Sequence, residues 1–354
     1  MLKFLILLRI KANFADILGN LTKLMNQKKT TTTDISQIND LISHDMASVN
    51  KLIKISLSSD VPLINQLGQY IVNTGGKRLR PALVILSSKI FSYPGNQHIN
   101  LAAIIELIHT ATLLHDDVVD ASILRRGQKT ANQRWGNEAS VLVGDFVYSR
   151  AFQMMVNVNS LRIMKILSEA TNTIAEGEVQ QLINRHKPET SENNYLYVIR
   201  NKTAKLFEAA AQLGVVISNK TTTEEKAMAS YGRHLGTAFQ LIDDALDYSS
   251  CENELGKNIG DDLSQGNPTL PLLYAMWNGD KKQSQIIRDS ISNGGLENID
   301  VIKDTINSTG AISYTAEIAK QESELAINAL NQLPSSKYLD ALCSLAKFSV
   351  ERES

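Results

Sequence analysis

This chain of 354 residues contains little cysteine and has almost no net charge, and each of these features argues against a class of protein. Its two cysteines, Cys251 and Cys343, form no C-x-x-C pair, which argues against a disulfide framework or a zinc site and favours a reducing, cytoplasmic setting. The 36 Lys and Arg nearly balance the 37 Asp and Glu. Such a balance gives no support for nucleic-acid binding.

The N-terminal stretch also lacks a long apolar run, because Phe4–Leu8 is too short to cross a bilayer. No small-residue cleavage site follows it, so a signal peptide is not expected. A transit peptide remains an alternative, since Lys3, Arg9 and Lys11 precede the first acidic residue. We expect residues 1–36 to be a disordered or amphipathic extension.

Proline is absent between Gly95 and Lys187 and again between Glu189 and Asn267. Within these spans apolar residues recur at i, i+3, i+4 and i+7, which is the helical period, and the alternation typical of strands is scarce. No repeat of fixed period and no linker divides the rest of the chain. The sequence therefore predicts an all-α protein of ten or more helices, with one helical domain over residues 37–354.

Two acidic boxes of identical D-D-x-x-D spacing follow apolar helical runs. The first comprises Asp116, Asp117 and Asp120, and the second comprises Asp243, Asp244 and Asp247. Positions i and i+4 share one helix face, so each box can present two carboxylates one turn apart. A single box is most simply a solvated helix end, but two facing boxes would form an oxygen-rich cavity suited to Mg²⁺.

Cationic residues accompany both boxes. The segment TGGKRLRP contains Lys77, Arg78 and Arg80 after a Gly-Gly turn, and Arg125 and Arg126 follow the first box by one loop. Arginine binds phosphate through two parallel hydrogen bonds, and glycine lets the backbone approach a ligand closely. Lys202 and Thr203 lie in RNKTAKLF, and Lys257 follows the second box. Carboxylates beside cations indicate one or two diphosphate sites.

These motifs, in this order, resemble those of the trans-isoprenyl diphosphate synthases, from about Asp40 to the C-terminus. HTATLLHDDVVDASILRRG and ASVLVGDFVYSRAFQMM are most similar to the long-chain, octaprenyl-type members that make quinone side chains. The resemblance implies a single large helical bundle around an elongated central cavity. It also implies a prenyltransferase that uses Mg²⁺ to elongate an allylic diphosphate, such as farnesyl diphosphate, with isopentenyl diphosphate. Homodimers are usual in the family, and the apolar product implies transient membrane association.

The resemblance also assigns roles to individual residues. Asp116 and Asp120 become the main metal ligands of the first box, with Asp117 beside them, and Asp243, Asp244 and Asp247 become the ligands of the second. The isopentenyl diphosphate site would comprise Lys77, Arg80, His109 and Arg126. The allylic diphosphate would contact Arg125, Lys202, Thr203, Gln240 and Lys257. Thr203 and Gln240 would also turn oxygens toward the allylic cation. The catalytic residues that the resemblance implies are therefore Lys202, Thr203 and Gln240, together with Asp116, Asp120 and Asp243.

Chain length is predicted from the residues that precede the first box. The growing chain should run toward the start of this helix, where Ala111 and Thr112 are small and leave a tunnel open. The floor would then lie near Ile108, Ile104 or the pair Met154 and Met155. The plainer interpretation is that Ala111 is a close helix–helix packing point and that the methionines are core residues.

Three other functions compete with this interpretation. A di-iron bundle needs two Glu-x-x-His pairs, and the sequence supplies one, Glu106 and His109. Terpene cyclases share aspartate-rich helices but do not need an isopentenyl diphosphate site, and GGKRLRP argues against them. Non-enzymatic regulatory subunits typically lose the aspartate boxes, whereas both are intact here.

Overall fold

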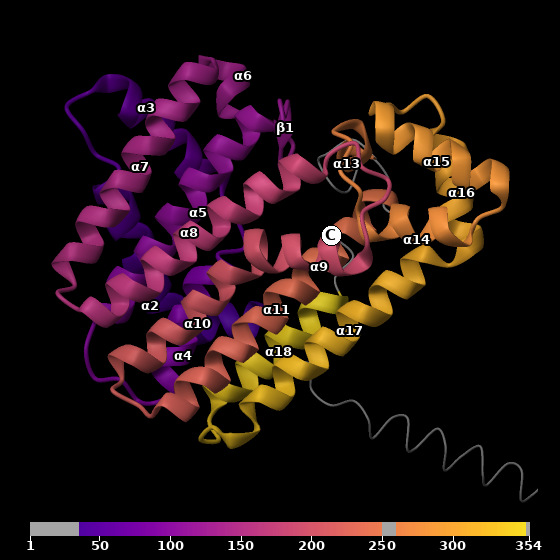
Figure 1. Cartoon of the computed structure of the whole chain (residues 1–354). Coiled ribbons are helices and arrows are strands. Elements are labelled where there is room, and N and C mark those ends of the chain that lie inside the picture. Colours follow the sequence, from indigo (N-terminus) through magenta and orange to yellow (C-terminus); the bar gives the residue numbers. More distant parts are fainter. Residues whose placement is uncertain (1–34, 250–259, 352–354) are drawn as a thin grey trace, which may run out of the picture.

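A computed structural model of the chain describes residues 35–249 and 260–351 (Figure 1). The prediction of an all-α protein is confirmed, with many more than ten helices. The predicted N-terminal extension and Lys257 lie outside the described residues, except that Ile35 and Ser36 begin the first helix.

The elements follow one another in a simple order. They are α2 (Ile35–Ser56), α3 (Pro62–Thr74), α4 (Leu79–Ile90), α5 (Gln97–Val119), β1 (Leu124–Arg125), β2 (Gln128–Lys129), α6 (Ala131–Trp135), α7 (Asn137–Asn157), α8 (Leu161–Asn184), α9 (Glu192–Ile199), the π-helix η1 (Arg200–Ala204), α10 (Lys205–Ile217), α11 (Thr222–Ser249), α13 (Asp261–Ser264), α14 (Leu270–Asn278), α15 (Lys281–Asn293), α16 (Ile299–Thr309), α17 (Ala311–Ala329), the 3-10 helix η2 (Leu330–Gln332) and α18 (Lys337–Glu351).

The apolar side chains form two clusters. The larger one fills the bundle of α2, α4, α5, α7, α8, α10 and α18. The smaller one lies among α9 and α13–α16, of which α14, α15 and α16 are on the right of Figure 1. Helices α11 and α17 pack on each other along their length and contribute to both clusters. Burial of apolar area at this scale is the main force that holds the bundle together.

Helix α5 is apolar on most of its faces because other helices surround it. Eight of its residues from Leu101 to Ala111 carry apolar side chains with no exposed surface, and α2, α4, α7 and α10 all contact this helix. The helix ends where the chain turns polar, and Asp120 caps its C-terminus. The first aspartate box is thus placed at the end of a rigid, central helix.

The predicted loop RRGQKT is a two-residue β-hairpin. Strands β1 and β2 pair antiparallel, and the turn residues Arg126 and Gly127 both have positive φ, 54° and 72°. This backbone is typical of a type I′ turn, whose twist matches that of the strands. No helix in the described part of the chain combines the length and the apolar character required to span a membrane.

Candidate functional site

The first aspartate box presents its three carboxylates to three different cationic partners. Asp117 is buried and accepts two hydrogen bonds from Arg125, at 2.8 Å from Nε and 2.6 Å from Nη2. Asp116 lies 3.7 Å from the Nζ of Lys202, and Asp120 forms an ion pair with Arg185. Asp116 and Asp120 therefore face the α8–η1 side, while Asp117 turns toward the hairpin. Their assignment as metal ligands stays a prediction.

The second aspartate box lies in the last turns of α11. Asp244 is buried, and it accepts hydrogen bonds from the hydroxyl of Tyr195 at 2.6 Å and from Nε2 of Gln240 at 2.7 Å. Burial, reinforced by the nearby Asp262, raises the pKa of Asp244 well above its ordinary value. Asp247 is also buried, whereas Asp243 is only partly buried and lies within electrostatic range of Arg80.

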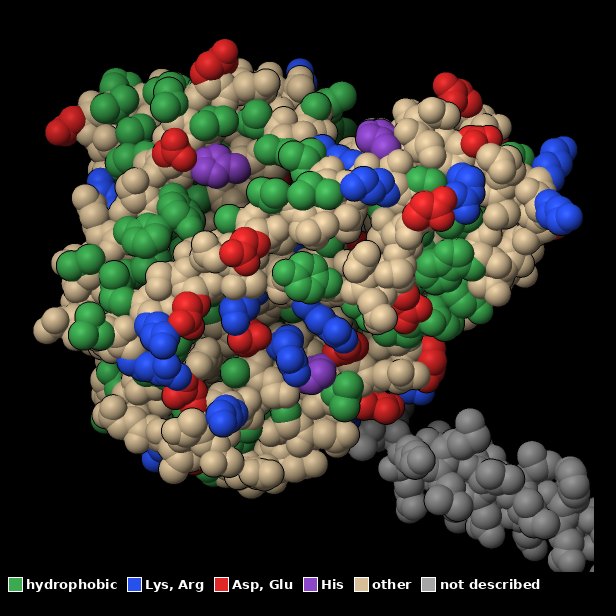
Figure 2. Space-filling model, viewed as in Figure 1, with side chains coloured by type: hydrophobic (Ala, Val, Ile, Leu, Met, Phe, Trp, Pro, Cys, Tyr) green, Lys and Arg blue, Asp and Glu red, His purple; other side chains and the backbone are tan. Residues whose placement is uncertain are grey.

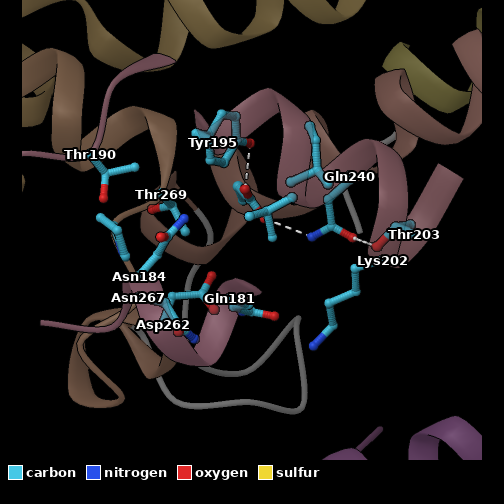
Figure 3. Close-up of a pocket in the computed structure, with 14 residues that line it drawn as sticks. Gln181, Asn184, Thr190, Tyr195, Lys202, Thr203, Gln240, Asp262, Asn267 and Thr269 are labelled. Atoms are coloured by element: carbon cyan, nitrogen blue, oxygen red, sulfur yellow. Dashed lines mark hydrogen bonds between the residues drawn. The ribbon is translucent and has the colours of Figure 1, made fainter. Parts of the chain in front are cut away.

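A chain of hydrogen bonds joins η1 to the second box (Figure 3). The hydroxyl of Thr203 donates to Oε1 of Gln240 at 3.0 Å, and the amide of Gln240 donates onward to Asp244. These contacts fix which way the Gln240 amide points. Lys202, Thr203 and Gln240 line one pocket with Asp244, Asp262 and Tyr195, and its open space is about 520 Å³. The structure therefore brings together three of the residues predicted to contact the allylic diphosphate.

Lys202 has a second partner that the sequence did not reveal. Its Nζ lies 2.6 Å from Oε2 of Glu178 on α8. Burial would lower the pKa of Lys202, but Asp116 and Glu178 outweigh it and raise that pKa. Burial and Asp116 raise the pKa of Glu178 to about 7, and burial raises that of Asp116. Negative charge is thus crowded where the first box meets α8.

This crowding tests whether a metal fits the site. Within the described residues, no three His, Cys, Asp or Glu side chains converge to hold an ion as they stand, because Lys202 and Arg185 pair with the box instead. Burial and the repulsion between neighbouring carboxylates raise the pKa of Asp116 and of Glu178, so negative charge is unfavourable here. Oxygen donors of this kind suit hard divalent cations. A cation at the boxes would relieve the repulsion, so the donor set fits.

The predicted basic site lies at the start of α4 and along α5. Nη1 of Arg80 is 3.0 Å from Nε2 of His109, and the guanidinium lies 4.4 Å from the ring of Phe207. Burial and the neighbouring Arg80 lower the pKa of His109 well below its ordinary value. Arginine can only donate, so neutral His109 accepts at Nε2. Burial lowers the pKa of Arg80 to about 10, which keeps it charged at neutral pH.

The Gly-Gly turn brings the two basic clusters together. A Cβ on Gly76 would stand 2.7 Å from Nη1 of Arg126, so a side chain there would displace this guanidinium. Lys77 is exposed, with its Nζ 5.9 Å from the ring of Phe348. Arg126, Arg78 and His109 line a second pocket, of about 580 Å³.

Arg125 also lines this second pocket, whereas the sequence placed it with Lys202 at the allylic diphosphate. Its pairing with Asp117 explains the location, because the hairpin points its guanidinium at the buried face of the box. Its assignment to the allylic substrate stays a prediction. The structure also argues against the di-iron alternative. The two residues of its one Glu-x-x-His pair have separate arginine partners, since Glu106 pairs with Arg78 and His109 contacts Arg80.

The predicted chain-length residues divide into two groups. Ala111, Ile108 and Met155 have no exposed surface and belong to the larger apolar cluster. Thr112 and Met154 are partly buried, and the sulfur of Met154 accepts a hydrogen bond from Ser56 at 3.4 Å. The tunnel past Ala111 therefore stays a prediction, because the structure shows that side chain closely packed.

Glu178, Arg185 and Tyr195 are site residues that sequence reasoning missed. One signal could have indicated α8, since Gly177 interrupts a strongly helical run, and an interior glycine usually has a packing reason. A Cβ there would stand 2.6 Å from the backbone nitrogen of Lys202. Arg185 directly follows α8, and no local pattern marks it as a partner of Asp120.

Known proteins resemble this chain over most of its length. A family model described as polyprenyl synthetase matches residues 61–309. Octaprenyl diphosphate synthase of Escherichia coli (strain K12) is 52% identical over 321 residues, which cover 90% of this chain and 99% of that protein. The protein of the same name from Haemophilus influenzae is 51% identical over 326 residues, which cover 92% of this chain and 99% of that protein.

The fold also matches solved structures. A polyprenyl synthase from Caulobacter crescentus, complexed with calcium and isoprenyl diphosphate, superposes with a TM-score of 0.88 at 40% identity. The match covers 91% of this chain and 98% of that chain. A decaprenyl diphosphate synthase from Rhodobacter capsulatus superposes with a TM-score of 0.85 at 39% identity, covering 90% and 99%.

Proposed function

The chain belongs to the polyprenyl synthetase family, and we propose that it elongates an allylic diphosphate, farnesyl diphosphate as the starter, with isopentenyl diphosphate to all-trans octaprenyl diphosphate. The observation that carries this proposal is that η1 connects the two aspartate boxes. Lys202 lies 3.7 Å from Asp116 of the first box, and Thr203 donates a hydrogen bond to Gln240, which donates to Asp244 of the second. The 52% identity to an octaprenyl diphosphate synthase supports the product length. A product of this length would serve as a quinone side chain.

The two pockets divide the substrates between them. Lys202, Thr203 and Gln240 bind the allylic diphosphate in the pocket between α8 and α11. Lys77, Arg80, His109 and Arg126 bind the diphosphate of isopentenyl diphosphate at the start of α4 and beside the hairpin. Lys257 and Arg125 complete the allylic set in this proposal. The charge of Arg80 is maintained near Asp243, which connects the two halves of the site.

The reaction then needs little covalent chemistry from the protein. The bond between C1 of the allylic chain and its diphosphate breaks, and the double bond of isopentenyl diphosphate attacks C1 to form a new carbon–carbon bond. A proton lost from the carbon next to the new cation restores a double bond and passes to the departed pyrophosphate. Lys202 stabilises the leaving diphosphate as charge develops on it.

Gln240 and Thr203 stabilise the other half of the transition state. Because the Gln240 amide donates to Asp244, its carbonyl oxygen is turned toward Thr203 and η1. Oxygen dipoles fixed in this way favour an allylic cation without having to reorient during the reaction. The apolar side chains of α5 and α7 exclude water, which would otherwise capture the cation.

We propose Mg²⁺ as the metal, held by Asp116 and Asp120 on one side and by the second box, chiefly Asp243, on the other. When bound, it supplies Lewis-acid stabilisation of the leaving pyrophosphate. Asp117 and Asp244 are better suited to hold their neighbours in place. Arg125 donates two hydrogen bonds to Oδ1 of Asp117, and Gln240 and Tyr195 donate to the two oxygens of Asp244.

We also propose that the enzyme is a cytoplasmic homodimer that meets the membrane through its apolar product. Apolar side chains are exposed along α7 and α8, and Figure 2 shows hydrophobic groups gathered over this face. Several exposed apolar side chains on one face favour a protein partner. The side chains concerned are Leu142, Val156, Leu161, Val179, Leu182 and Ile183. Analytical ultracentrifugation measures the expected dimer directly.

The decisive test of the activity is incubation of the purified protein with farnesyl diphosphate, isopentenyl diphosphate and Mg²⁺. Chromatography of the dephosphorylated products should show octaprenol. A shorter or longer ladder of products would correct the length, and the absence of any elongation would refute the function.

A further inference from the structure

The residues that bind the allylic diphosphate sit in an unusual turn. Helix α9, η1 and α10 follow one another without a break, and the backbone angles at Arg200 and Lys205 remain helical. Lys202 and Thr203 therefore lie in a single π turn inside one long helix. Such turns are rare, because their hydrogen bonds are poorer than those of an α-helix, and they often occur at functional sites. Packing from outside must hold this one in place.

Two glycines hold η1 between neighbouring helices. A Cβ on Gly177 of α8 would stand 2.6 Å from the backbone nitrogen of Lys202, and one on Gly236 of α11 would stand 2.6 Å from Cα of Ala204. The turn is thus in backbone contact on two sides. These contacts fix its middle and its end, but they leave its first residue, Arg200, to be fixed by other means.

A buried carboxylate on α17 holds that first residue. Oε1 of Glu322 accepts a hydrogen bond from Nη2 of Arg200 at 2.9 Å, and Oε2 lies 2.5 Å from Nδ1 of His234 on α11. Burial would raise the pKa of Glu322, but the hydrogen bonds from His234 and Arg200 outweigh it and lower that pKa. Glu322 is therefore ionised at neutral pH and joins η1, α11 and α17, although it lines neither pocket described above.

We propose that Glu322 is a positioning residue for the allylic diphosphate, acting through Arg200 on the π turn that carries Lys202 and Thr203. The inference rests on the proposed function. Without the anchor, the turn can relax toward α-helical hydrogen bonding. Adjacent residues of a helix differ by about 100° in direction, so a change of register would swing the Lys202 ammonium away from its pocket while leaving the isopentenyl diphosphate residues on α4 and α5 undisturbed.

The test compares Glu322→Ala with a matched control, Glu225→Ala. Glu225 also accepts hydrogen bonds from two other helices, through Arg162 and Gln212, but it has no part in η1. Steady-state kinetics of the full-length enzyme should show the KM for farnesyl diphosphate raised about tenfold or more in Glu322→Ala, because small misplacements of binding groups have effects of this size. The KM for isopentenyl diphosphate should change less than about twofold in both variants.

Arg200 supplies the second arm of the experiment. Its side chain is partly exposed, so Arg200→Ala should fold even where loss of the buried Glu322 does not. It should raise the same KM, and the double variant should be no worse than Glu322→Ala alone, because Glu322→Ala already removes the contact with Arg200. Arg200→Lys, which keeps the charge, should recover most of the affinity.

Two results would overturn the inference. If Arg200→Ala and folded Glu322→Ala keep the wild-type KM for farnesyl diphosphate, Glu322 only stabilises the fold. If Glu225→Ala raises this KM equally, the effect is a general loosening of the bundle. A wild-type enzyme that elongates no substrate would refute the proposed function together with this inference, whereas an active wild type with unaffected variants refutes the inference alone.

Discussion

Glu178→Gln should make the protein more stable at alkaline pH, although it removes an ion pair. Oε2 of Glu178 lies 2.6 Å from the Nζ of Lys202, and a simple count of contacts would predict a loss of stability. Burial and the charge of Asp116 nevertheless raise the pKa of Glu178 from an ordinary 4.5 to about 7. Glutamine has the same shape as protonated glutamate and cannot acquire the unfavourable charge.

The direction of the pH dependence follows from proton linkage. Because the folded-state pKa lies above the unfolded one, the folded protein retains a proton that the unfolded chain has released, and stability falls as pH rises from about 4.5 to about 7. At about 1.4 kcal/mol for each pKa unit, the full difference corresponds to about 3 kcal/mol. Glu178→Gln should recover about 3 kcal/mol at pH 8 and only about 1 kcal/mol at pH 5.

Urea denaturation followed by circular dichroism, with EDTA present, measures this change in the free energy of unfolding. Glu176→Gln is the matched control, because Glu176 lies on the same helix but is exposed and should respond little at either pH. A Glu178→Gln protein that is no more stable than wild type at pH 8 would refute the reasoning. In that case the attraction to Lys202 would outweigh the cost of burying the charge.

Three further predictions concern the reaction. Asp116→Ala and Asp243→Ala should each lower kcat by roughly a thousandfold or more with little loss of folding, and near-normal kcat in either variant contradicts the two-box mechanism. EDTA should stop the wild-type enzyme until Mg²⁺ is restored. Lys77→Ala and Arg80→Ala should raise the KM for isopentenyl diphosphate by about one to two powers of ten, since a charged hydrogen bond contributes about 1.5–3 kcal/mol. A larger effect on the KM for the allylic diphosphate would mean that the two sites are exchanged. Ala111→Tyr should shorten the product to roughly three or four isoprene units, as measured by chromatography, since one helical turn rises about 5.4 Å. Overpacking costs about 1–3 kcal/mol of stability, so folding is measured alongside. An active, folded variant with the wild-type product length refutes this path for the chain.

The helices and both aspartate boxes could be predicted because their signals are local. Apolar periodicity and the absence of proline mark the helices, and the repeated D-D-x-x-D spacing marks Asp116 and Asp243. Glu178 and Tyr195 could not be found in this way. Each lies in a helix that contains many other polar residues. Glu178 meets Lys202 only because α8 packs against η1, and Tyr195 meets Asp244 only because α9 packs against α11.

The π turn at Arg200–Ala204 illustrates the same limit. Its sequence, RNKTA, continues helical periodicity on either side, and the extra residue in the turn is imposed by tertiary contacts at Gly177 and Gly236. The hairpin at Arg126 was expected only as a loop. Its two-residue turn depends on positive φ at a non-glycine residue, which the sequence alone does not specify.

Lys202 pairs with Asp116 and Glu178, so its ammonium neutralises the same carboxylates that a divalent cation would neutralise. A cation that takes over these carboxylates frees the ammonium for an anionic ligand, and an anionic ligand that takes the ammonium leaves the carboxylates in need of a cation. Each ligand thus lowers the free-energy cost of binding the other. Because such coupling is reciprocal, the factor by which Mg²⁺ tightens the allylic diphosphate should equal the factor by which the diphosphate tightens Mg²⁺.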